Sequence, residues 1–374
     1  MKTDRGVGIY VHIPFCKRKC DYCDFASFAG KENLSSAYFS ALESEISQKK
    51  DKYGALTVDS VFFGGGTPSL PESSYLTGIL DVLREKFNFS ENPEITTEVN
   101  PDSGSFEKLK AYKEAGFNRI SIGLQSANDE ELKTLSRVHD FKKFTVCYEN
   151  ALRAGFTDIN VDLMSAIPGQ TLKSYEKTLK TVAELNPSHI SAYSLILEEG
   201  TPFFERFKDG KGLPDEDTDR EMYALTRAFL KGYGFERYEI SNYAKPGFEC
   251  KHNIGYWERK PYLGLGLAAA SLMNETRYQK HGDLRRYIDG DFSEDTEKLD
   301  RTSQMEEFMF LGLRLIKGVS VERFKELFGK SIEEEYGDVL KKLNEEGLLL
   351  FDDRVYLTEK GLDVANYCMS KFIK

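Results

Sequence analysis

Tryptophan, histidine, cysteine, basic charge and long apolar runs are all scarce in this chain of 374 residues. The sequence contains one tryptophan, five histidines and six cysteines. No apolar run approaches the ~20 residues that a membrane-spanning helix needs, and the N-terminus shows no signal-peptide pattern. The 61 acidic and 51 basic residues give a formal net charge of −10, whereas a general nucleic-acid binder presents a basic face. These absences predict a cytoplasmic protein with no nucleic-acid partner.

Although cysteine is rare, three cysteines stand within eight residues. Cys16, Cys20 and Cys23 have the spacing C-x3-C-x2-C and follow an apolar run. A loop this tight can point three thiolates at one centre, and such soft ligands select zinc, copper or an iron–sulfur cluster. A disulfide is disfavoured because nothing in the sequence indicates an oxidising compartment. The other cysteines, at 147, 250 and 368, are single and scattered.

The number of cysteines separates the possible metal sites. A closed structural zinc site and an ordinary cubane cluster each use four protein ligands. A zinc site in this loop would need His12, Asp21 or Asp24 as its fourth ligand, and the second cysteine pair typical of zinc knuckles is absent from the sequence. A [4Fe–4S] cluster held by three cysteines leaves one iron open to an exchangeable ligand. The pattern favours this open cluster, with zinc as the alternative.

Short apolar runs alternate with longer amphipathic stretches along the first half of the chain, which is typical of β–α units around a parallel sheet. The runs are nearly continuous in apolar residues, as expected of strands that are buried on both faces. Predicted strands are 7–14, 60–63, 94–99, 119–123, 159–163 and 190–195, and predicted helices are 35–49, 75–87, 106–115, 129–137, 144–154 and 173–185. Six units without a seventh and eighth predict an α/β fold, a partial, TIM-like (β/α)6 barrel.

Beyond residue 197 the pattern loosens. The sequence predicts a loop at 198–219, a helix at 221–231, a short strand at 238–241 and an acidic linker at 292–297, then helices at 304–316, 321–327 and 332–346 and a hairpin at 348–357. The expected domains are a barrel at 1–240, a barrel extension with linker at 241–295, and a small C-terminal helical, winged-helix-like domain at 296–374. Residues 301–374 carry 12 basic and 14 acidic residues, so this domain is expected to act as a lid or docking module rather than to bind DNA.

Chemistry in a β/α barrel sits at the carboxyl ends of the strands. The second predicted strand ends in Gly64–Pro68, where glycines let the backbone approach a ligand closely. This loop is not a phosphate-binding P-loop, because no Gly-Lys-Ser/Thr follows it. Glu98 and Gln125 end the third and fourth strands, and Asp162 lies on the fifth. These residues are therefore candidates for one site at the barrel mouth.

The segment from Tyr10 to Cys23 resembles the cluster motif of radical S-adenosylmethionine (SAM) proteins, and more narrowly that of the oxygen-independent coproporphyrinogen III oxidase group. The resemblance implies a [4Fe–4S] cluster held by the three cysteines, with SAM as the exchangeable ligand that reduction cleaves to a 5′-deoxyadenosyl radical. It also implies a set of SAM-contacting positions: Tyr10, Gly65, Gly66, Thr67, Glu98, Gln125, Arg137 and Asp162. Glu98 and Asp162 suit ribose hydroxyls or a cationic amine, and Arg137 suits a carboxylate through bidentate pairing.

Two departures from the oxidase pattern favour a sister group of heme chaperones. Phe25 stands where the oxidases carry a fourth cysteine, and their long N-terminal extension is absent from this sequence. The segment from Cys250 to Trp257 also fits the His-Asn-x-x-Tyr-Trp signature of the sister group. This resemblance implies that His252 is an axial heme ligand, with the Cys250 thiolate as a less favoured alternative. Ala270, however, stands where sequences of the sister group commonly carry histidine.

The resemblance therefore implies a cytoplasmic protein that binds a [4Fe–4S] cluster, SAM and heme. Its expected task is heme transfer to respiratory hemoproteins, at the membrane surface, with an electron donor that serves the cluster. The alternative is a true oxidase, which decarboxylates the propionates of coproporphyrinogen III. Phe25 and the short N-terminal segment favour the chaperone.

Overall fold

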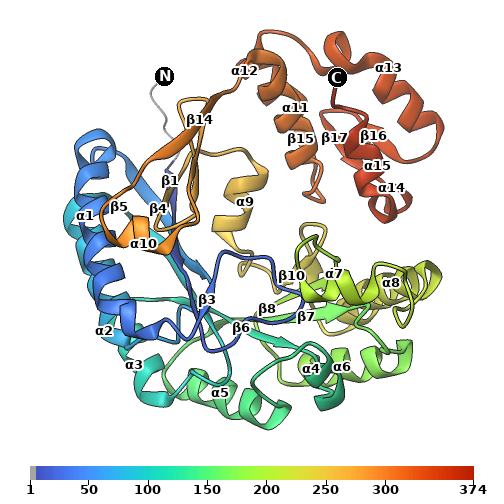
Figure 1. Cartoon of the computed structure of the whole chain (residues 1–374). Helices are drawn as coiled ribbons and strands as arrows, with labels where there is room; N and C mark the ends of the chain where they lie inside the picture. The colour runs from blue at the N-terminus through green and yellow to red at the C-terminus, as the bar shows by residue number, and fades with distance from the viewer. Residues whose placement is uncertain (1–5) are drawn as a thin grey trace.

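The computed structural model of the chain, described here for residues 6–374, contains a parallel six-stranded sheet curved into an open barrel (Figure 1). Neighbouring strands pair in parallel and in chain order. They are β1 (Val7–Ile13), β4 (Thr57–Gly65), β5 (Asn88–Val99), β6 (Arg119–Gln125), β7 (Asp158–Ser165) and β8 (His189–Ser194). All six strands expected from the sequence are present, so the predicted partial (β/α)6 barrel is confirmed.

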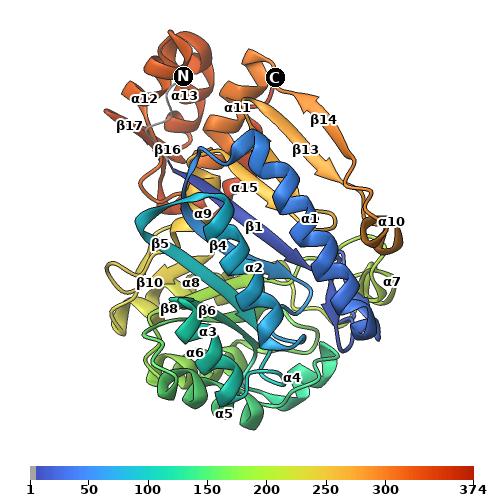
Figure 2. The same ribbon diagram turned by 90° about the vertical axis from the view of Figure 1, so that its left-hand side faces the viewer.

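Helices cover the outer face of this sheet, as the view of α1 and α2 over β1, β4 and β5 in Figure 2 shows. They are α1 (Ser35–Tyr53), α2 (Ser73–Lys86), α3 (Phe106–Ala115), α4 (Asp129–Thr134), α5 (Phe141–Arg153) and α6 (Leu172–Glu184). Four of these helices begin at a residue whose side chain accepts a backbone N–H of the first turn: Ser105, Asn128, Asp140 and Thr171. Such caps satisfy amides that have no partner inside the helix.

The sheet continues past both edges of the barrel. Beside β8 lie β10 (Asn242–Ala244) and β9 (Glu236–Arg237). Beside β1 lie β11 (Tyr262–Leu265), β12 (Ala270–Met273), β13 (Thr276–Lys280) and β14 (Glu294–Lys298). The linker predicted at 292–297 is therefore wrong, because β14 pairs along its whole length with β13. The strand predicted at 238–241 is also wrong, since β9 and β10 flank that segment.

The loop predicted at 198–219 contains a short helix, α7 (Pro202–Phe207), followed by α8 (Glu216–Gly232). Thr201 caps α7, and Pro202 stands in its first turn. Amides of the first turn have no acceptor inside the helix, so the missing N–H of proline costs no helical hydrogen bond. The ring of Phe203, fully buried, packs edge-on against Tyr22 in the cysteine loop. The Phe203 amide also donates to the Asp21 carbonyl at 2.9 Å. This helix therefore supports the cysteine loop.

The remaining short elements connect these layers. Strands β2 (Phe15–Cys16) and β3 (Phe28–Ala29) pair beside the cysteine loop, and a 3-10 helix (Glu32–Leu34) precedes α1. Helix α9 (Lys251–Trp257) precedes β11, and α10 (Leu284–Ile288) lies between β13 and β14.

The C-terminal domain has an apolar core of its own. Its elements are α11 (Arg301–Gly312), β15 (Val319–Ser320), α12 (Val321–Phe328), α13 (Ile332–Glu345), β16 (Leu349–Phe351), β17 (Arg354–Leu357), α14 (Glu359–Asp363) and α15 (Ala365–Ser370). Three helices followed by a hairpin are as the sequence predicts, and β15 adds a third strand beside β17. Within residues 6–374, no helix is both long enough and apolar enough to cross a membrane.

Candidate functional site

The three clustered cysteines line one cavity of about 370 Å³ at the mouth of the barrel. The thiols of Cys16, Cys20 and Cys23 are all free. Ion pairs hold both halves of their loop: Lys17 to Asp102 at 2.6 Å, and Asp21 to Arg206 at 3.1 Å. The loop is thus held by ion pairs on both sides, and its three thiols line the same cavity.

The donor chemistry of this loop fits an open iron–sulfur cluster. Among the described residues, no three His, Cys, Asp or Glu side chains are already arranged around a metal position. Burial raises the pKa of the Cys16 thiol and raises that of Cys23 to about 11. Ligation by iron would oppose this effect, because a coordinated thiol is deprotonated. Phe25, whose side chain offers no metal ligand, lines the same cavity.

The glycine-rich end of β4 lies directly on the cysteine loop. The Gly66 amide donates to the Ile13 carbonyl, and the Thr67 amide donates to the Phe15 carbonyl, both at 2.8 Å. A Cβ on Gly66 would lie 2.8 Å from the Phe15 carbonyl oxygen and 3.1 Å from Cys16 Sγ. Gly65 has a φ of +108°, which only glycine adopts without strain. These glycines therefore serve the packing of the loop, and their contact with SAM stays a prediction.

Two carboxyl groups, Glu98 on β5 and Asp162 on β7, line the cavity from the strands on either side of β6. Glu98 accepts the Gly65 backbone N–H, and burial raises its pKa to about 8, with the nearby Asp162 charge adding to the shift. Asp162 accepts Asn160 Nδ2 at 2.7 Å and Ser121 Oγ at 3.1 Å. Its pKa is also raised by burial, although these donors oppose the rise. Asp162 is the better stabilised anion, and Glu98 is the group that holds a proton near neutral pH.

Arg137 approaches the cysteine loop from the opposite wall. Its Nη2 donates to the Gly123 carbonyl at 2.8 Å, and its Nη1 lies 3.6 Å from Cys20 Sγ. The buried Nε of Arg137 has no acceptor in the described structure, so the guanidinium retains capacity for an anion. Gln125 lines the same cavity, where its Oε1 accepts Tyr193 Oη at 3.0 Å. His139 lies behind Arg137, and burial lowers its pKa to about 3.

A second cavity of about 430 Å³ adjoins the first inside the barrel. The two cavities share five lining residues: Phe25, Gly65, Glu98, Ser121 and Asp162. Tyr10 lines the second cavity rather than the first, and its hydroxyl lies 3.1 Å from His12 Nδ1. The first cavity therefore brings together every predicted cluster and SAM residue except Tyr10.

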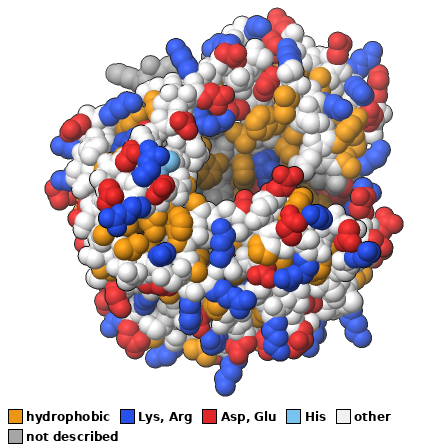
Figure 3. All heavy atoms as spheres, in the orientation of Figure 1, with side chains coloured by type: hydrophobic (Ala, Val, Ile, Leu, Met, Phe, Trp, Pro, Cys, Tyr) orange, Lys and Arg blue, Asp and Glu red, His pale blue; other side chains and the backbone are white. Residues whose placement is uncertain are grey.

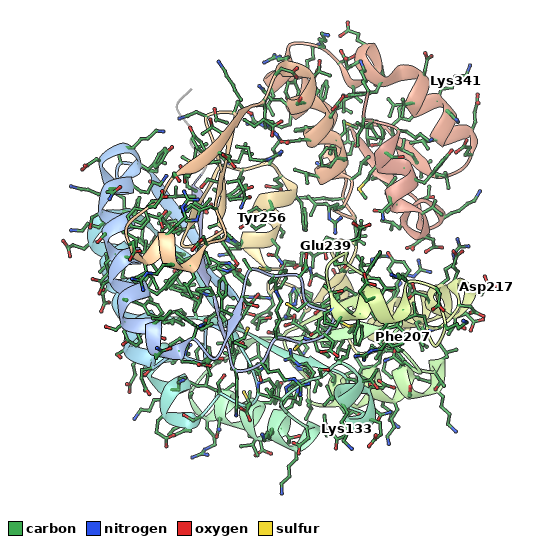
Figure 4. All side chains as sticks on the ribbon, viewed as in Figure 1. Lys133, Phe207, Asp217, Glu239, Tyr256 and Lys341 are labelled. Atoms are coloured by element: carbon green, nitrogen blue, oxygen red, sulfur yellow. The ribbon has the colours of Figure 1, made fainter. Side chains whose placement is uncertain are left out.

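Helix α9 places His252 in the wall of the second cavity. His252 Nδ1 lies 2.9 Å from Ser60 Oγ, and Nε2 lies 2.9 Å from Tyr256 Oη. Its ring stacks on Phe62, with 5.3 Å between the centroids. Burial lowers the pKa of His252 to about 3, so the imidazole is neutral. Figure 4 marks Tyr256 on this helix, near the centre of the molecule.

Cys250 stands apart from both cavities. Its side chain is fully buried, and Sγ donates to Glu94 at 3.4 Å. Glu94 also accepts the backbone N–H groups of Lys251 and His252, at 2.8 and 3.0 Å. The carboxylate thus caps α9, with Cys250 as part of the cap. This position argues against the alternative prediction of Cys250 as a heme thiolate.

The sequence analysis names Phe25 only as a departure from the oxidase pattern, yet this residue, 57% exposed, lines both cavities. Two further residues that shape the site, Ser60 and Glu94, were missed. Ser60, 192 residues from His252 in the sequence, contacts the His252 ring. Glu94, 158 residues away, accepts the His252 backbone N–H. Nothing local in the sequence indicates such distant partners.

Comparisons with known proteins identify the family and the fold of the chain. Residues 10–182 match the model of the radical SAM superfamily, and residues 299–364 match that of the HemN C-terminal domain. The chain is 38% identical to the heme chaperone HemW of Bacillus subtilis, over 97% of this chain and 98% of the relative. It is 33% identical to the heme chaperone HemW of Escherichia coli, over 83% of each chain. The solved coproporphyrinogen III oxidase of Escherichia coli, a radical SAM enzyme, superposes with a TM-score of 0.87 at 25% identity, covering 98% of this chain and 90% of that one.

Proposed function

This chain belongs to the HemW family of radical SAM proteins, and from that premise we propose that it is a cytoplasmic heme chaperone. In this proposal it binds a [4Fe–4S] cluster, SAM and heme, draws electrons for the cluster from a donor protein, and delivers heme to respiratory hemoproteins. The observation that carries the proposal is the pair of adjoining cavities, one lined by the three cysteines and the other by His252.

Cys16, Cys20 and Cys23 would hold the cluster, and the remaining residues of the first cavity would position SAM. When bound, these cofactors supply one-electron chemistry. Arg137 has an unpartnered Nε for the SAM carboxylate. Asp162 accepts hydrogen bonds from Ser121 and Asn160, which orient its carboxyl group toward ribose hydroxyls or an amine. Gly66 and Thr67 are hydrogen-bonded through their backbone to the cysteine loop, and this position would leave room for the ligand.

His252 would contact heme from the second cavity. A neutral imidazole is the form that ligates iron, and the lowered pKa of His252 maintains that form at all ordinary pH values. Both ring nitrogens are engaged, so ligation through Nε2 replaces the Tyr256 contact, while Ser60 continues to hold Nδ1. A hydrogen bond on the second nitrogen fixes the tautomer and orientation of a ligating histidine.

The second candidate function is coproporphyrinogen III decarboxylation, because the oxidase of Escherichia coli shares the fold over nearly the whole chain. Phe25 weighs against it, since the oxidase pattern has a fourth cysteine at this position. An anaerobic assay with reconstituted cluster, SAM and reductant separates the two functions. We expect no SAM-dependent carbon dioxide release from the porphyrinogen. Robust release would establish the oxidase and reject the chaperone.

The cluster assignment is tested by iron analysis. Reconstituted wild type should hold about four irons per chain, and alanine at Cys16, Cys20 or Cys23 should abolish this content. Cys147→Ala and Cys368→Ala are matched controls, because both thiols are buried outside the cavities. Stoichiometric zinc without iron would reject the cluster.

Heme contact is tested by hemin titration. His252→Ala should weaken binding and shift the Soret band, while iron–sulfur content stays unchanged. Cys250→Ser should leave the Soret band in place, because the sulfur does not reach a cavity. Failure of wild type to bind hemin would end the chaperone proposal.

A further inference from the structure

Helix α9 presents its two ends to different parts of the molecule. His252 lies in the barrel, whereas Trp257, the one tryptophan of the chain, lies against the C-terminal domain. The guanidinium of Arg314 stacks on the indole, 4.3 Å from the ring centroid. The signature motif therefore spans from the second cavity to the junction between barrel and C-terminal domain.

A third cavity of about 250 Å³ lies at this junction, with Trp257 in its wall. Its apolar lining comes from the C-terminal domain and the segment after α11: Phe308, Leu315 and Val319. In Figure 3, apolar side chains gather along the side of the central hollow that faces this domain. The cavity is thus lined by one indole ring and an apolar wall.

The polar lining of this third cavity is basic. Lys317, Arg323 and Arg354 line it, and Glu258 is the one acidic residue among its lining. Lys317 pairs with Glu258 at 2.8 Å. Arg354 donates to the carbonyls of Lys317 and Gly318, both at 2.6 Å, which leaves its positive charge without a carboxylate in the described structure. In a chain with a net charge of −10, three cations thus line one apolar cavity, and Arg354 is the one of the three without an ion pair in the described structure.

Two residues that line this cavity each carry a buried N–H without a partner. Trp257 Nε1 and Arg323 Nε have no hydrogen-bond acceptor in the described structure. Arg323 Nη1 donates to Glu326 on the same helix at 2.9 Å, and the Arg323 side chain is 35% exposed. Its guanidinium can therefore turn to a carboxylate without breaking a contact between domains. An aromatic face, an apolar wall and free cationic donors together suit a flat apolar molecule that carries carboxylates.

We propose that the third cavity binds the carboxylate edge of a porphyrin, as an outer station that heme occupies between solvent and the His252 cavity. This inference rests on the proposed heme chaperone function. The cavity volume fits one edge of the macrocycle, with the propionates against Arg323 and Arg354 and the ring against Trp257. Helix α9 lies between the two stations, so a single element contacts heme at both.

The test uses metal-free protoporphyrin IX, which His252 cannot ligate. Its binding to the reconstituted full chain is followed by porphyrin fluorescence anisotropy, beside that of protoporphyrin dimethyl ester, which has no carboxylates. We expect wild type to bind the acid about tenfold more tightly than the ester, as one charge-assisted contact allows. Arg323→Gln should abolish this tenfold difference, and Arg354→Gln should reduce it. Lys341→Gln is the control, because Lys341 is exposed on α13, far from the cavity (Figure 4).

Equal affinity for acid and ester, or an unchanged affinity in Arg323→Gln, would overturn the outer station. Inorganic phosphate provides a further arm: displacement of the acid by micromolar phosphate would make the cavity a general anion site and reject the porphyrin. Hemin titration distinguishes failure of the outer station from failure of the heme chaperone function. A His252-dependent Soret band together with Arg323-independent porphyrin binding would reject the outer station alone, whereas absence of any hemin binding would reject the chaperone function itself.

Discussion

Gly66 shows how one residue can decide whether the cysteine loop keeps its shape. A Cβ at this position would crowd the Phe15 carbonyl at 2.8 Å and Cys16 Sγ at 3.1 Å, and both neighbours belong to the loop itself. Because the loop holds the predicted cluster ligands, we expect Gly66→Ala to reduce iron content after reconstitution at least severalfold. Iron and sulfide analysis gives the readout.

Gly78→Ala is the matched control for this change. Gly78 lies within α2, and a Cβ there would meet nothing within 4 Å. Alanine favours a helix over glycine by about 1 kcal/mol, so this variant should retain full iron and gain stability. Full iron content in Gly66→Ala would show that the loop adapts to the added methyl group.

Glu98 gives the SAM-free protein a pH-dependent stability. Its folded-state pKa is about 8, above the 4.5 of an ordinary glutamate, so the folded protein holds a proton that the unfolded chain releases. The stability that this proton provides is fully present below pH 4.5 and is lost as the pH rises through 8. We therefore expect the free energy of unfolding of wild type, measured with urea, to fall between about pH 5 and pH 8. Glu98→Gln should flatten this dependence, and equal slopes for the two proteins would contradict the assignment.

At this scale the sequence predicts residues whose chemistry is local. The spacing of Cys16, Cys20 and Cys23 indicates a shared centre without any knowledge of the fold, and the cavity contains all three. Glycines followed by threonine at a strand end are likewise visible in the sequence. Ser60 is not, because a serine inside a strand has no distinguishing neighbours and its partner, His252, lies 192 residues away.

Among the elements, helix α9 depends on a carboxylate from β5. Glu94 accepts two backbone N–H groups and the Cys250 thiol at the start of this helix. Removal of a buried acceptor leaves its donors unsatisfied, at about 1–3 kcal/mol. We expect Glu94→Ala to lower the free energy of unfolding by at least that amount and to broaden the hemin Soret band, because His252 loses its fixed orientation.

Glu91→Ala serves as the control, since Glu91 is exposed on the same strand. It should change neither stability nor spectrum measurably. If Glu94→Ala lost stability but kept the wild-type Soret band, the cap would be structural only and would not position His252.

Two of the segments that the sequence analysis predicted wrongly, 292–297 and 198–219, were misjudged for physical reasons. Residues 292–297 carry three acidic side chains, Glu294, Asp295 and Glu297, which favoured a linker. Charge is, however, also tolerated on an exposed strand at the edge of a sheet. Helix α7 has six residues, too few for a recognisable apolar period. Its stability comes from Phe203 packing on Tyr22, a contact between segments far apart in the chain.

For the whole molecule, a buried ion pair joins the first helix to the strands beyond β1. Lys280 Nζ lies 2.8 Å from Glu45, and both side chains are 1% exposed. Tyr287 Oη donates to the same carboxylate at 2.6 Å. Removal of one partner of a buried pair costs about 3–5 kcal/mol when the other charge is left uncompensated. Lys280 Nζ also lies 3.3 Å from Glu294 and keeps this partner when Glu45 is neutralised. We therefore expect Glu45→Gln to lower the free energy of unfolding by about 3 kcal/mol, the lower end of this range, by urea denaturation.

Glu43→Gln, on the exposed side of α1, should be nearly neutral. The double change Glu45→Leu with Lys280→Met should recover most of the loss, because an apolar pair replaces the ionic one. A double variant as unstable as the single one would mean that packing, rather than the uncompensated charge, causes the loss.

The sequence also predicts the separate C-terminal domain, since its apolar residues follow helix and hairpin periods. It does not predict where that domain sits. The contact of Trp257 with Arg314, and the cavity beside it, depend on docking between segments 57 residues apart. Local periodicity carries no information about such docking, so the third cavity emerges only from the folded chain.

The acidic strand β14 also bears on how the protein behaves at high concentration. It is the last strand on its side of the sheet, so one row of its backbone groups has no neighbouring strand. Residues 295–298 are exposed, and Asp295 and Glu297 are acidic. If β14 of a second molecule paired with this edge, in parallel or antiparallel orientation, acidic side chains of the two strands would lie side by side. The composition that resembles a linker therefore protects an open sheet from edge-to-edge polymerisation.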